Sequence, residues 1–515
     1  MVTTAPYGSW PSPISAEQMA VGGNRLGGPQ WIGNQLWWTE GIAAEGGRQA
    51  IIRTVGDVSA ASKSPETATV LPAPFNARSR VHEYGGASWI AIEHDGAPTP
   101  LILFVNFSDQ RIYRFHEGEE PEPISPEGLE VPTAHGPSLR WAQPTGVVLA
   151  HGTHEVWWVC EEHQHVQDDT GAPKIERYIA SVPLDGSAVD DISAVRRITD
   201  SSRFVADPQI SPDGSRLAWV TWEHPHMPWD GTELHIGELA DSEAGVVVIK
   251  ESVVDGDTST SVLNPRWRSN EALVYISDRS GWWNPWTWEV GEAPRQIVQV
   301  EQEFAGPLWQ LGMSWLEVID SERLLTIHGT ATDQLGVLDV TTGRVSELEL
   351  PHTAIASTAF RQDGVLAIHG VRANDFAAIS TAEFELPSST STPTIGELRT
   401  IRSSRHDAPN PALLPTPEPI TVIAENGQPV HAVLYRPFQE GYSAPAGELP
   451  PTSPKYMEGP RERPVLGCRL PPPTTQAVAS AWWTSTMAGP PDSAVLTGTG
   501  SRGSGAWLTW RTLSR

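Results

Sequence analysis

The chain of 515 residues carries 62 Asp and Glu against 35 Lys and Arg, which gives a formal charge of −27. Because this charge repels phosphate, nucleic acid is excluded as a partner. The length exceeds what one compact core supports, and it predicts two domains or a large propeller with an appended segment. Cys160 and Cys468 are too few for a disulfide framework, and no apolar run has the length of a membrane span. The N-terminus lacks a signal-peptide pattern, so we expect a cytoplasmic protein.

Residues 1–25 are rich in turn-forming residues and are predicted to be an N-terminal extension. The first strands are Gln30–Ile32 and Gln35–Glu40, which Gly33 and Asn34 separate as a hairpin turn. Arg48–Val55 is predicted to be the partner strand. This arrangement indicates the start of an antiparallel sheet.

A charged and aromatic cluster, His82-Glu83-Tyr84, comes next and is closed by Gly85 and Gly86. One interpretation is that the Glu83 carboxylate contacts a ligand. The alternative is a hydrogen-bonding role at the end of a strand. We take His82, Glu83 and Tyr84 as candidate substrate-binding residues, with both interpretations open.

Two more strand pairs follow, Leu101–Val105 with Arg111–Phe115 and Glu155–Cys160 with Tyr178–Val182. Between the last two strands, the segment Glu161–Lys174 is polar and is predicted to be exposed. Its Glu161-Glu162-His163 sequence has the same two interpretations as the His82 cluster.

The clearest repeat unit spans Ile210–Leu239. It opens with the turn Pro212-Asp213-Gly214, continues with the strand Leu217–Trp222, and returns through the strand Thr232–Ile236. The pattern recurs after Trp267 and again, more weakly, before Val365. Repeats of this length with such turns are typical of propeller blades.

No long stretch before about residue 400 has helical periodicity, so the predicted fold class is all-β: a β-propeller of seven blades over residues 26–400. Residues 401–450 are predicted to hold a linker and the first hairpin of a second domain. That hairpin, Ile420–Ile423 with Val430–Pro437, turns about Asn426-Gly427.

Several collinear stretches resemble the prolyl oligopeptidase family of serine peptidases, in its acylaminoacyl-peptidase and dipeptidyl-aminopeptidase branch. The stretches are Tyr7–Ile14, Pro72–Asn76, Arg80–Gly86, His224–Asp230, Ser277–Asn284, Gly312–Trp315, the hairpin Pro417–Pro437 and Gly447–Pro451. The resemblance implies a propeller that covers the active site of an α/β-hydrolase domain and admits only short peptides. In the central channel of such a propeller, the carboxylate of Glu83 would meet the amino terminus of a peptide. We expect no cofactor and no metal.

The resemblance stops after Pro451, and the composition changes there. Residues 451–515 hold seven Lys and Arg and three Asp and Glu, whereas the preceding residues hold 28 and 59. The segment is rich in Pro, Gly, Ser, Thr and Ala and has no Phe or Ile, so it is predicted to be a disordered, non-native tail.

A reading-frame shift near Pro451 explains the change. Trp and Met have one codon each, so the alternative frame is constrained: the codons of Ala481–Ala488 permit G-V-V-D-V-N-Y-G, and those of Lys455–Pro460 permit V-H-G-G-P. Ala506–Thr512 likewise permits V-V-D-V-E-D. In chain order, starting from Lys455–Pro460, the strings resemble the start of a hydrolase domain of the same family. The alternative explanation is a genuine disordered tail.

A peptidase of this family needs a serine on a G-x-S-x-G turn, followed by Asp and His in chain order. No such turn occurs after Pro437, and no histidine follows His431. The segment Gly500–Gly505 surrounds serines with glycines, but no strand precedes it. We therefore identify no catalytic residue in this chain.

Other candidates have structural explanations that we favour. His224, His226 and Asp230 are residue types that bind zinc, but histidines on either side of Pro225 are not expected to converge on one ion. Four tryptophans are assigned to blade packing: Trp282, Trp283, Trp286 and Trp288.

The sequence therefore predicts the propeller portion of a serine-type oligopeptidase that gates short peptides, in a chain that lacks the catalytic triad. The alternative is a non-catalytic propeller that binds peptides or a protein partner.

Overall fold

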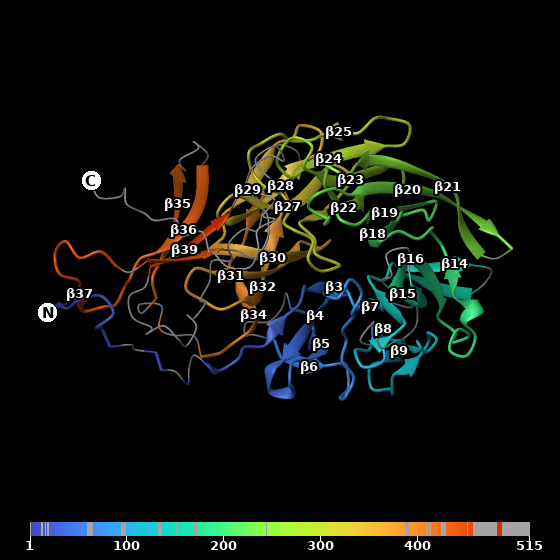
Figure 1. Ribbon diagram of the computed structural model, residues 1–515, viewed down its shortest axis with the longest axis horizontal. Helices are drawn as coiled ribbons and strands as arrows, with labels where there is room; N and C mark the ends of the chain where they lie inside the picture. The colour runs from blue at the N-terminus through green and yellow to red at the C-terminus, as the bar shows by residue number, and fades with distance from the viewer. Residues whose placement is uncertain are drawn as a thin grey trace.

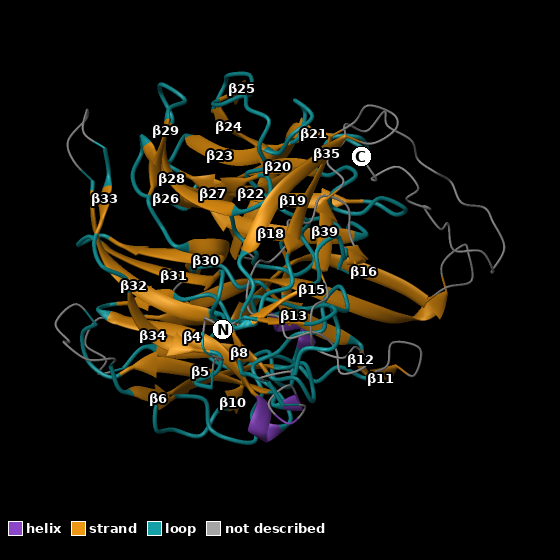
Figure 2. Ribbon diagram, turned by 90° about the vertical axis from the view of Figure 1, so that its left-hand side faces the viewer, coloured by secondary structure: helices purple, strands orange, loops and turns teal. Residues whose placement is uncertain are grey.

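The computed structural model describes residues 2–456 and 481–486, apart from positions 12–13, 16, 18–19, 59–64, 94–98, 132–135, 151–152, 168–172, 244, 387–391, 408–409, 411–413, 424–428 and 451. The regular secondary structure of the described chain is almost entirely β-strand, and seven sheets stand as blades around a ring (Figure 2). The predicted seven-bladed propeller is confirmed. No helix among the described residues is long and apolar enough to cross a membrane.

The first three blades, each given from its inner to its outer strand, have the following bounds. Blade 1 comprises β2 (Arg25–Leu26), β3 (Gln30–Ile32), β4 (Gln35–Ile42), β5 (Arg48–Thr54) and β6 (Thr67–Thr69). Blade 2 comprises β7 (Trp89–Ile92), β8 (Leu101–Val105), β9 (Ile112–His116) and β10 (Glu122–Pro123). Blade 3 comprises β13 (Leu139–Ala142), β14 (Val147–Ala150), β15 (Thr153–Gln167), β16 (Pro173–Pro183) and β17 (Arg196–Arg197). Between blades 2 and 3, β11 (Glu130–Val131) pairs with β12 (Gly136–Pro137).

The other four blades follow in chain order. Blade 4 comprises β18 (Phe204–Ile210), β19 (Arg216–Trp222), β20 (Glu233–Ser242) and β21 (Gly245–Gly256). Blade 5 comprises β22 (Val262–Trp267), β23 (Ala272–Ser277), β24 (Asn284–Glu289) and β25 (Arg295–Gln296). Blade 6 comprises β26 (Leu316–Val318), β27 (Arg323–Gly329), β28 (Asp333–Asp339) and β29 (Val345–Leu348). Blade 7 comprises β30 (His352–Arg361), β31 (Val365–Arg372), β32 (Ala378–Glu385), β33 (Thr394–Ile395) and β34 (Arg399–Ser403).

The second strand of each blade is apolar because neighbouring blades cover both of its faces. All six residues of β23 are buried, and in β19 every residue after Arg216 is buried. Large side chains fill the space between blades, among them Trp38, Trp157 and Trp158, which are fully buried. The sequence prediction of strands buried on both faces is confirmed.

A polar residue with a left-handed backbone, followed by proline, lies within or directly after the inner strands of three blades: Gln143 (φ 49°) after β13, Asp207 (φ 52°) in β18 and Asn264 (φ 51°) in β22. Asp207 N donates to Gln143 Oε1 (2.9 Å), and Asn264 Nδ2 donates to Asp207 Oδ2 (3.2 Å). The strand register shifts at Asp207 and at Asn264. These buried side chains therefore link the inner strands of blades 3, 4 and 5 in place of the ladder bonds that the bulges remove.

Each blade is built from consecutive strands, so among the described strands none is exchanged between blades 7 and 1. Side chains join that seam instead. Trp31 Nε1 donates to Ala359 O (2.9 Å), the Arg361 guanidinium lies 4.6 Å from the centre of the Trp31 ring, and Arg402 Nε donates to buried Glu40 (2.9 Å).

A four-stranded sheet follows the propeller and lies to its left in Figure 1. Its order is β35 (Pro417–Ile423), β36 (Pro429–Tyr435), β39 (Ala481–Thr486) and β38 (Thr452–Tyr456). β35 and β36 pair antiparallel as the predicted hairpin, and β38 runs parallel to β39. The predicted turn at Asn426-Gly427 and the rest of the predicted tail lie outside the described residues.

The N-terminal segment lies beside this sheet rather than on a blade. β1 (Thr3–Thr4) pairs in parallel with β37 (Tyr442–Ser443), and Tyr7 N donates to Glu448 Oε1 (3.1 Å). The last strand of blade 7, β34, ends at the edge of the blade where the inner strand begins. The sheet that follows therefore lies toward that face of the ring, and we call this face of the ring the sheet-side face.

Candidate functional site

The segment 79–87 joins blade 1 to blade 2 and contains the predicted His82 cluster. Its backbone has positive φ at His82 (55°) and Glu83 (66°), where residues other than glycine are uncommon, and also at Gly85 (67°) and Gly86 (108°). A backbone of this kind persists only where surrounding contacts fix it.

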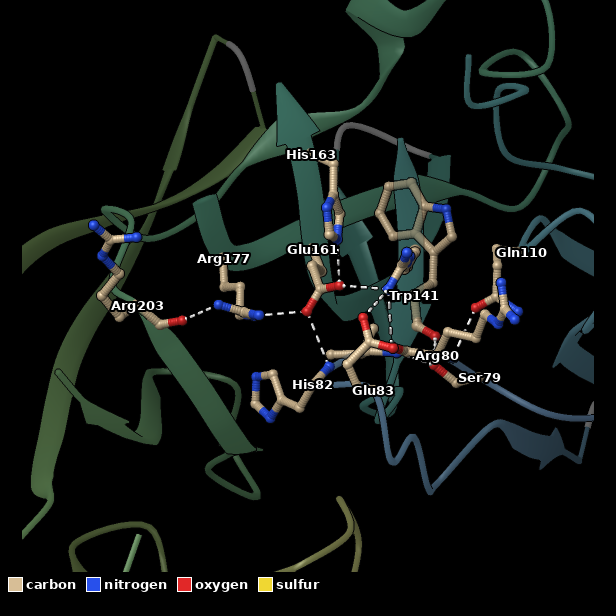
Figure 3. Close-up of polar contacts among 12 residues, drawn as sticks. Ser79, Arg80, His82, Glu83, Gln110, Trp141, Glu161, His163, Arg177 and Arg203 are labelled. Atoms are coloured by element: carbon tan, nitrogen blue, oxygen red, sulfur yellow. Dashed lines mark hydrogen bonds and ion pairs between the residues drawn. The ribbon is translucent and has the colours of Figure 1, made fainter. Parts of the chain in front are cut away.

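The contacts that fix it centre on the Glu161 carboxylate, which is fully buried in β15 (Figure 3). Its Oε2 atom accepts hydrogen bonds from the His82 amide (2.9 Å) and from Arg177 Nε (2.7 Å). Its Oε1 atom accepts one from Arg140 Nη1 (3.1 Å) and lies 2.7 Å from His163 Nε2. The Glu161 network therefore ties the 79–87 segment to both long strands of blade 3.

Electrostatics keep Glu161 ionised within this network. Burial alone would raise the pKa of the Glu161 carboxyl, but the Arg177 charge and the hydrogen bond from His163 outweigh it and hold the pKa well below its usual range. An ion pair this deeply buried is stable only while every partner is present.

His82 itself is half-buried beneath the segment, and the Nε2 atom of its ring is buried. Its ring makes edge-to-face contacts with Phe204 (5.2 Å between centroids) and Trp222 (5.4 Å) of blade 4. Burial, followed by the Arg177 charge, lowers the pKa of His82 to about 3. The side chain is therefore neutral at physiological pH, and its contacts are with the propeller interior.

Glu83 points the other way and is exposed. Arg140 Nη1 donates to Glu83 Oε1 (3.0 Å), yet the Glu83 side chain is 72% exposed while that of Arg140 is fully buried. One buried guanidinium thus joins an interior carboxylate, Glu161, to a surface carboxylate, Glu83. The buried Arg140 guanidinium therefore fixes the position of the negatively charged Glu83 carboxylate at the surface.

Tyr84 is 56% exposed and adds an aromatic surface next to Glu83. Its ring contacts Trp309 (5.7 Å between centroids, edge to face), and Trp309 contacts Trp229 (4.5 Å). The predicted cluster is therefore divided: Glu83 and Tyr84 face solvent, and His82 faces the interior.

The prediction that Glu161–Lys174 is exposed is wrong for Glu161 and His163, which are buried. The strand β15 continues through this polar stretch to Gln167. Arg140 of β13 and Arg177 of β16 lie directly opposite Glu161 in the sheet register. The sequence analysis identified neither arginine. A signal was present, because Glu161 and His163 are two positions apart and alternate residues of a strand lie on the same face.

The other candidates form no site among the described residues. His224, His226 and Asp230 lie in the turn between β19 and β20, where Asp230 Oδ2 accepts a hydrogen bond from the Met227 amide (2.8 Å). No group of three or more His, Cys, Asp or Glu side chains in the described part of the chain could hold a metal ion. Trp283 is buried and Trp286 and Trp288 pack on the core, as the sequence predicts. Gly500–Gly505 lies outside the described residues.

Comparison with known proteins places this geometry in a family. No family model and no curated protein matches the chain. Among solved structures, a puromycin-hydrolysing peptidase of Mycobacterium tuberculosis is 34% identical, with 94% of this chain and 69% of that chain covered and a TM-score of 0.79. A mutant puromycin hydrolase complexed with PGG is 32% identical, with 94% and 70% covered and a TM-score of 0.78.

A more distant structure shares the fold. Prolyl oligopeptidase B of Galerina marginata is 10% identical, with 92% of this chain and 63% of that chain covered and a TM-score of 0.57. The identity to the puromycin-hydrolysing peptidases extends over nearly the whole chain and more than two thirds of theirs. The chain therefore belongs to the prolyl oligopeptidase family.

Proposed function

We propose that this chain is the propeller portion of a serine-type oligopeptidase, in which the propeller gates short peptides to an α/β-hydrolase site. The supporting observation is the 34% identity to a puromycin-hydrolysing peptidase over 94% of the chain. The sheet after the propeller, with an antiparallel hairpin beside a parallel pair, is compatible with the start of such a domain.

The polypeptide as written has no catalytic triad in this proposal, because no G-x-S-x-G turn follows Pro437 and no histidine follows His431. We expect the purified chain to show no labelling by a serine-reactive fluorophosphonate, under conditions that label an intact peptidase of the family. Stoichiometric labelling would contradict the absence of a nucleophile.

A frame shift near Pro451 accounts for that absence. The described strand β39 (Ala481–Thr486) lies within Ala481–Ala488, where the alternative frame permits G-V-V-D-V-N-Y-G. β38 (Thr452–Tyr456) shares only Lys455 and Tyr456 with the stretch that permits V-H-G-G-P. Resequencing the DNA around the Pro451 codon tests this. Hydrolase sequence in the second frame supports a disrupted peptidase, whereas its absence favours the alternative, a propeller that binds peptides or a protein partner without catalysis.

Within this function, Glu83 is proposed to receive the amino terminus of the peptide, and Tyr84 to lie along it. Support comes from the exposed Glu83 carboxylate that Arg140 holds in place. A charge-assisted hydrogen bond contributes roughly 1.5–3 kcal/mol, so Glu83→Gln should weaken binding of a free-amine tripeptide about tenfold.

Calorimetry on the full chain tests this assignment. Amino-terminal acetylation of the tripeptide should abolish the difference between wild type and Glu83→Gln. Glu119→Gln is the matched control, because Glu119 is exposed in the turn after β9, away from the segment 79–87. Equal affinity of wild type and Glu83→Gln for the free-amine peptide would rule the assignment out.

A further inference from the structure

Two interblade connections meet although they belong to opposite parts of the ring. The segment 82–87 precedes the inner strand of blade 2, and the segment 309–313 precedes the inner strand of blade 6. These blades are not neighbours in a ring of seven. We call the two segments together the strap.

Backbone contacts join the two halves of the strap. Leu311 N donates to Gly85 O (2.9 Å), and Gly86 and Leu311 form a parallel β-bridge. Gln310 Nε2 donates to Tyr84 O (3.3 Å). The halves are therefore hydrogen-bonded to each other rather than merely adjacent.

Glycines allow this close approach. A Cβ atom on Gly86 would collide with Leu311 O, and one on Gly312 would lie 2.6 Å from Ala87 Cβ. Gly86 and Gly312 also have positive φ. The backbones consequently pack against each other with no room for a peptide between them.

The strap is anchored on the blades that lie between its ends. Gln143 N of blade 3 donates to Ala87 O (2.7 Å), Trp229 of blade 4 contacts Trp309, and Asn264 Nδ2 of blade 5 donates to Met313 O (2.9 Å). The strap therefore starts at blade 2, contacts blades 3 and 4, and ends in the connection before blade 6. To do so, it has to pass over the central channel.

A cavity of about 520 Å³ lies at the other end of the channel, where the inner strands end. Residues of blades 1, 4, 5, 6 and 7 line it, among them Trp31, Gln209, Trp267, Glu317 and Phe360. The strap lies at the opposite end, where the inner strands begin.

We propose that the strap is a fixed cross-brace over the channel, so that a peptide reaches Glu83 along the sheet-side face and not through the ring. This inference rests on the proposed function for the identity of the ligand. It requires the strap to stay closed in solution, and it requires Glu83 to be reachable by a peptide whose other end is too bulky for the channel.

Hydrogen exchange tests the first requirement without any ligand. The amides of Leu311 and Gln143 should exchange as slowly as those of the buried strand β19. Gly86→Ala should accelerate exchange at least tenfold in both 79–88 and 305–315, because the added methyl separates the halves. Gly118→Ala is the matched control, since Gly118 also has positive φ (93°) but nothing within 4 Å of an added Cβ.

Fast exchange of the wild-type strap, or acceleration of 79–88 alone in Gly86→Ala, would overturn the fixed brace. If Gly86→Ala unfolds the whole chain, β19 will exchange quickly as well, and the wild-type measurement then decides.

A tethered peptide tests the route. A free-amine tripeptide fused through its carboxyl end and a short linker to a folded carrier protein should bind with the same affinity as the free tripeptide. Binding of the free tripeptide but not of the fusion would show that the route runs through the channel. If neither the free tripeptide nor the fusion binds, the proposed function is contradicted. The hydrogen-exchange result would still decide whether the strap is a fixed brace.

Discussion

The propeller and the sheet that follows it are both built of strands, but they bury those strands very differently. All six residues of β23 in blade 5 are buried, whereas no residue of β35 in the following hairpin is. The exposed fraction of Ile423 at the end of β35 is 64%. Strand formation is therefore common to both regions, and stability depends on whether a neighbouring sheet covers each face.

Ion pairs show the same difference. Arg140 and Glu161 lie 3.1 Å apart with both side chains buried, whereas Arg436 and Glu418 lie 2.7 Å apart with both largely exposed. The shorter pair is expected to contribute less, because water screens it and its loss leaves no buried charge unpaired.

The largest expected effect comes from removing the carboxylate of the buried pair. Glu161→Ala removes the carboxylate that Arg177 faces and leaves Arg140 with the exposed Glu83 carboxylate, so the free energy of unfolding in urea should fall by about 3–5 kcal/mol. Glu418→Ala, the matched change in the exposed pair, should leave the free energy of unfolding close to the wild-type value, because water screens this pair. Similar losses for the two variants would remove the distinction between the regions.

An intermediate effect is expected from His82, whose folded pKa of about 3 lies below the ordinary value of 6.5. Between these values the unfolded chain binds the proton and the folded chain does not, so stability falls as the pH falls. Each such histidine contributes a slope of about 1.4 kcal/mol per pH unit. His82→Asn should reduce the slope of unfolding free energy between pH 4.5 and 6 by this amount, and asparagine tolerates the positive φ.

The matched control is His224→Asn, because His224 is exposed. Denaturation series at several pH values measure both variants. If His82→Asn keeps the wild-type slope, then the His82 side chain is not neutral in the folded protein in solution.

The smallest change in stability, within about 0.5 kcal/mol, is expected at the exposed end of the hairpin. Ile423→Lys should instead reduce light scattering at high protein concentration, because an exposed apolar strand edge promotes association. Ile249→Lys is the control: Ile249 is 62% exposed, but it lies on blade 4. Wild-type protein that stays monomeric at high concentration, or equal effects of the two variants, would contradict association through the hairpin.

Sequence patterns were sufficient where local chemistry decides the structure. The turn at Gly214 (φ 73°), the hairpin between β3 and β4, and the apolar strand β19 all occur where the sequence predicts them. The same reasoning failed at Glu161, because polar residues in a row resemble an exposed loop. Only the pairing of β13, β15 and β16 shows that three charged residues meet inside blade 3.

The sequence by itself determined the repeating strand-and-turn pattern, the seven blades and the family, because each blade is a short local unit whose turns and apolar strands are encoded within it. Tertiary structure alone decided which of three adjacent residues, His82, Glu83 and Tyr84, are exposed. It also decided that the segments before blades 2 and 6 meet over the channel. Those outcomes depend on contacts between residues more than fifty positions apart, such as Glu161 with the His82 amide and Leu311 with Gly85, which no local pattern encodes.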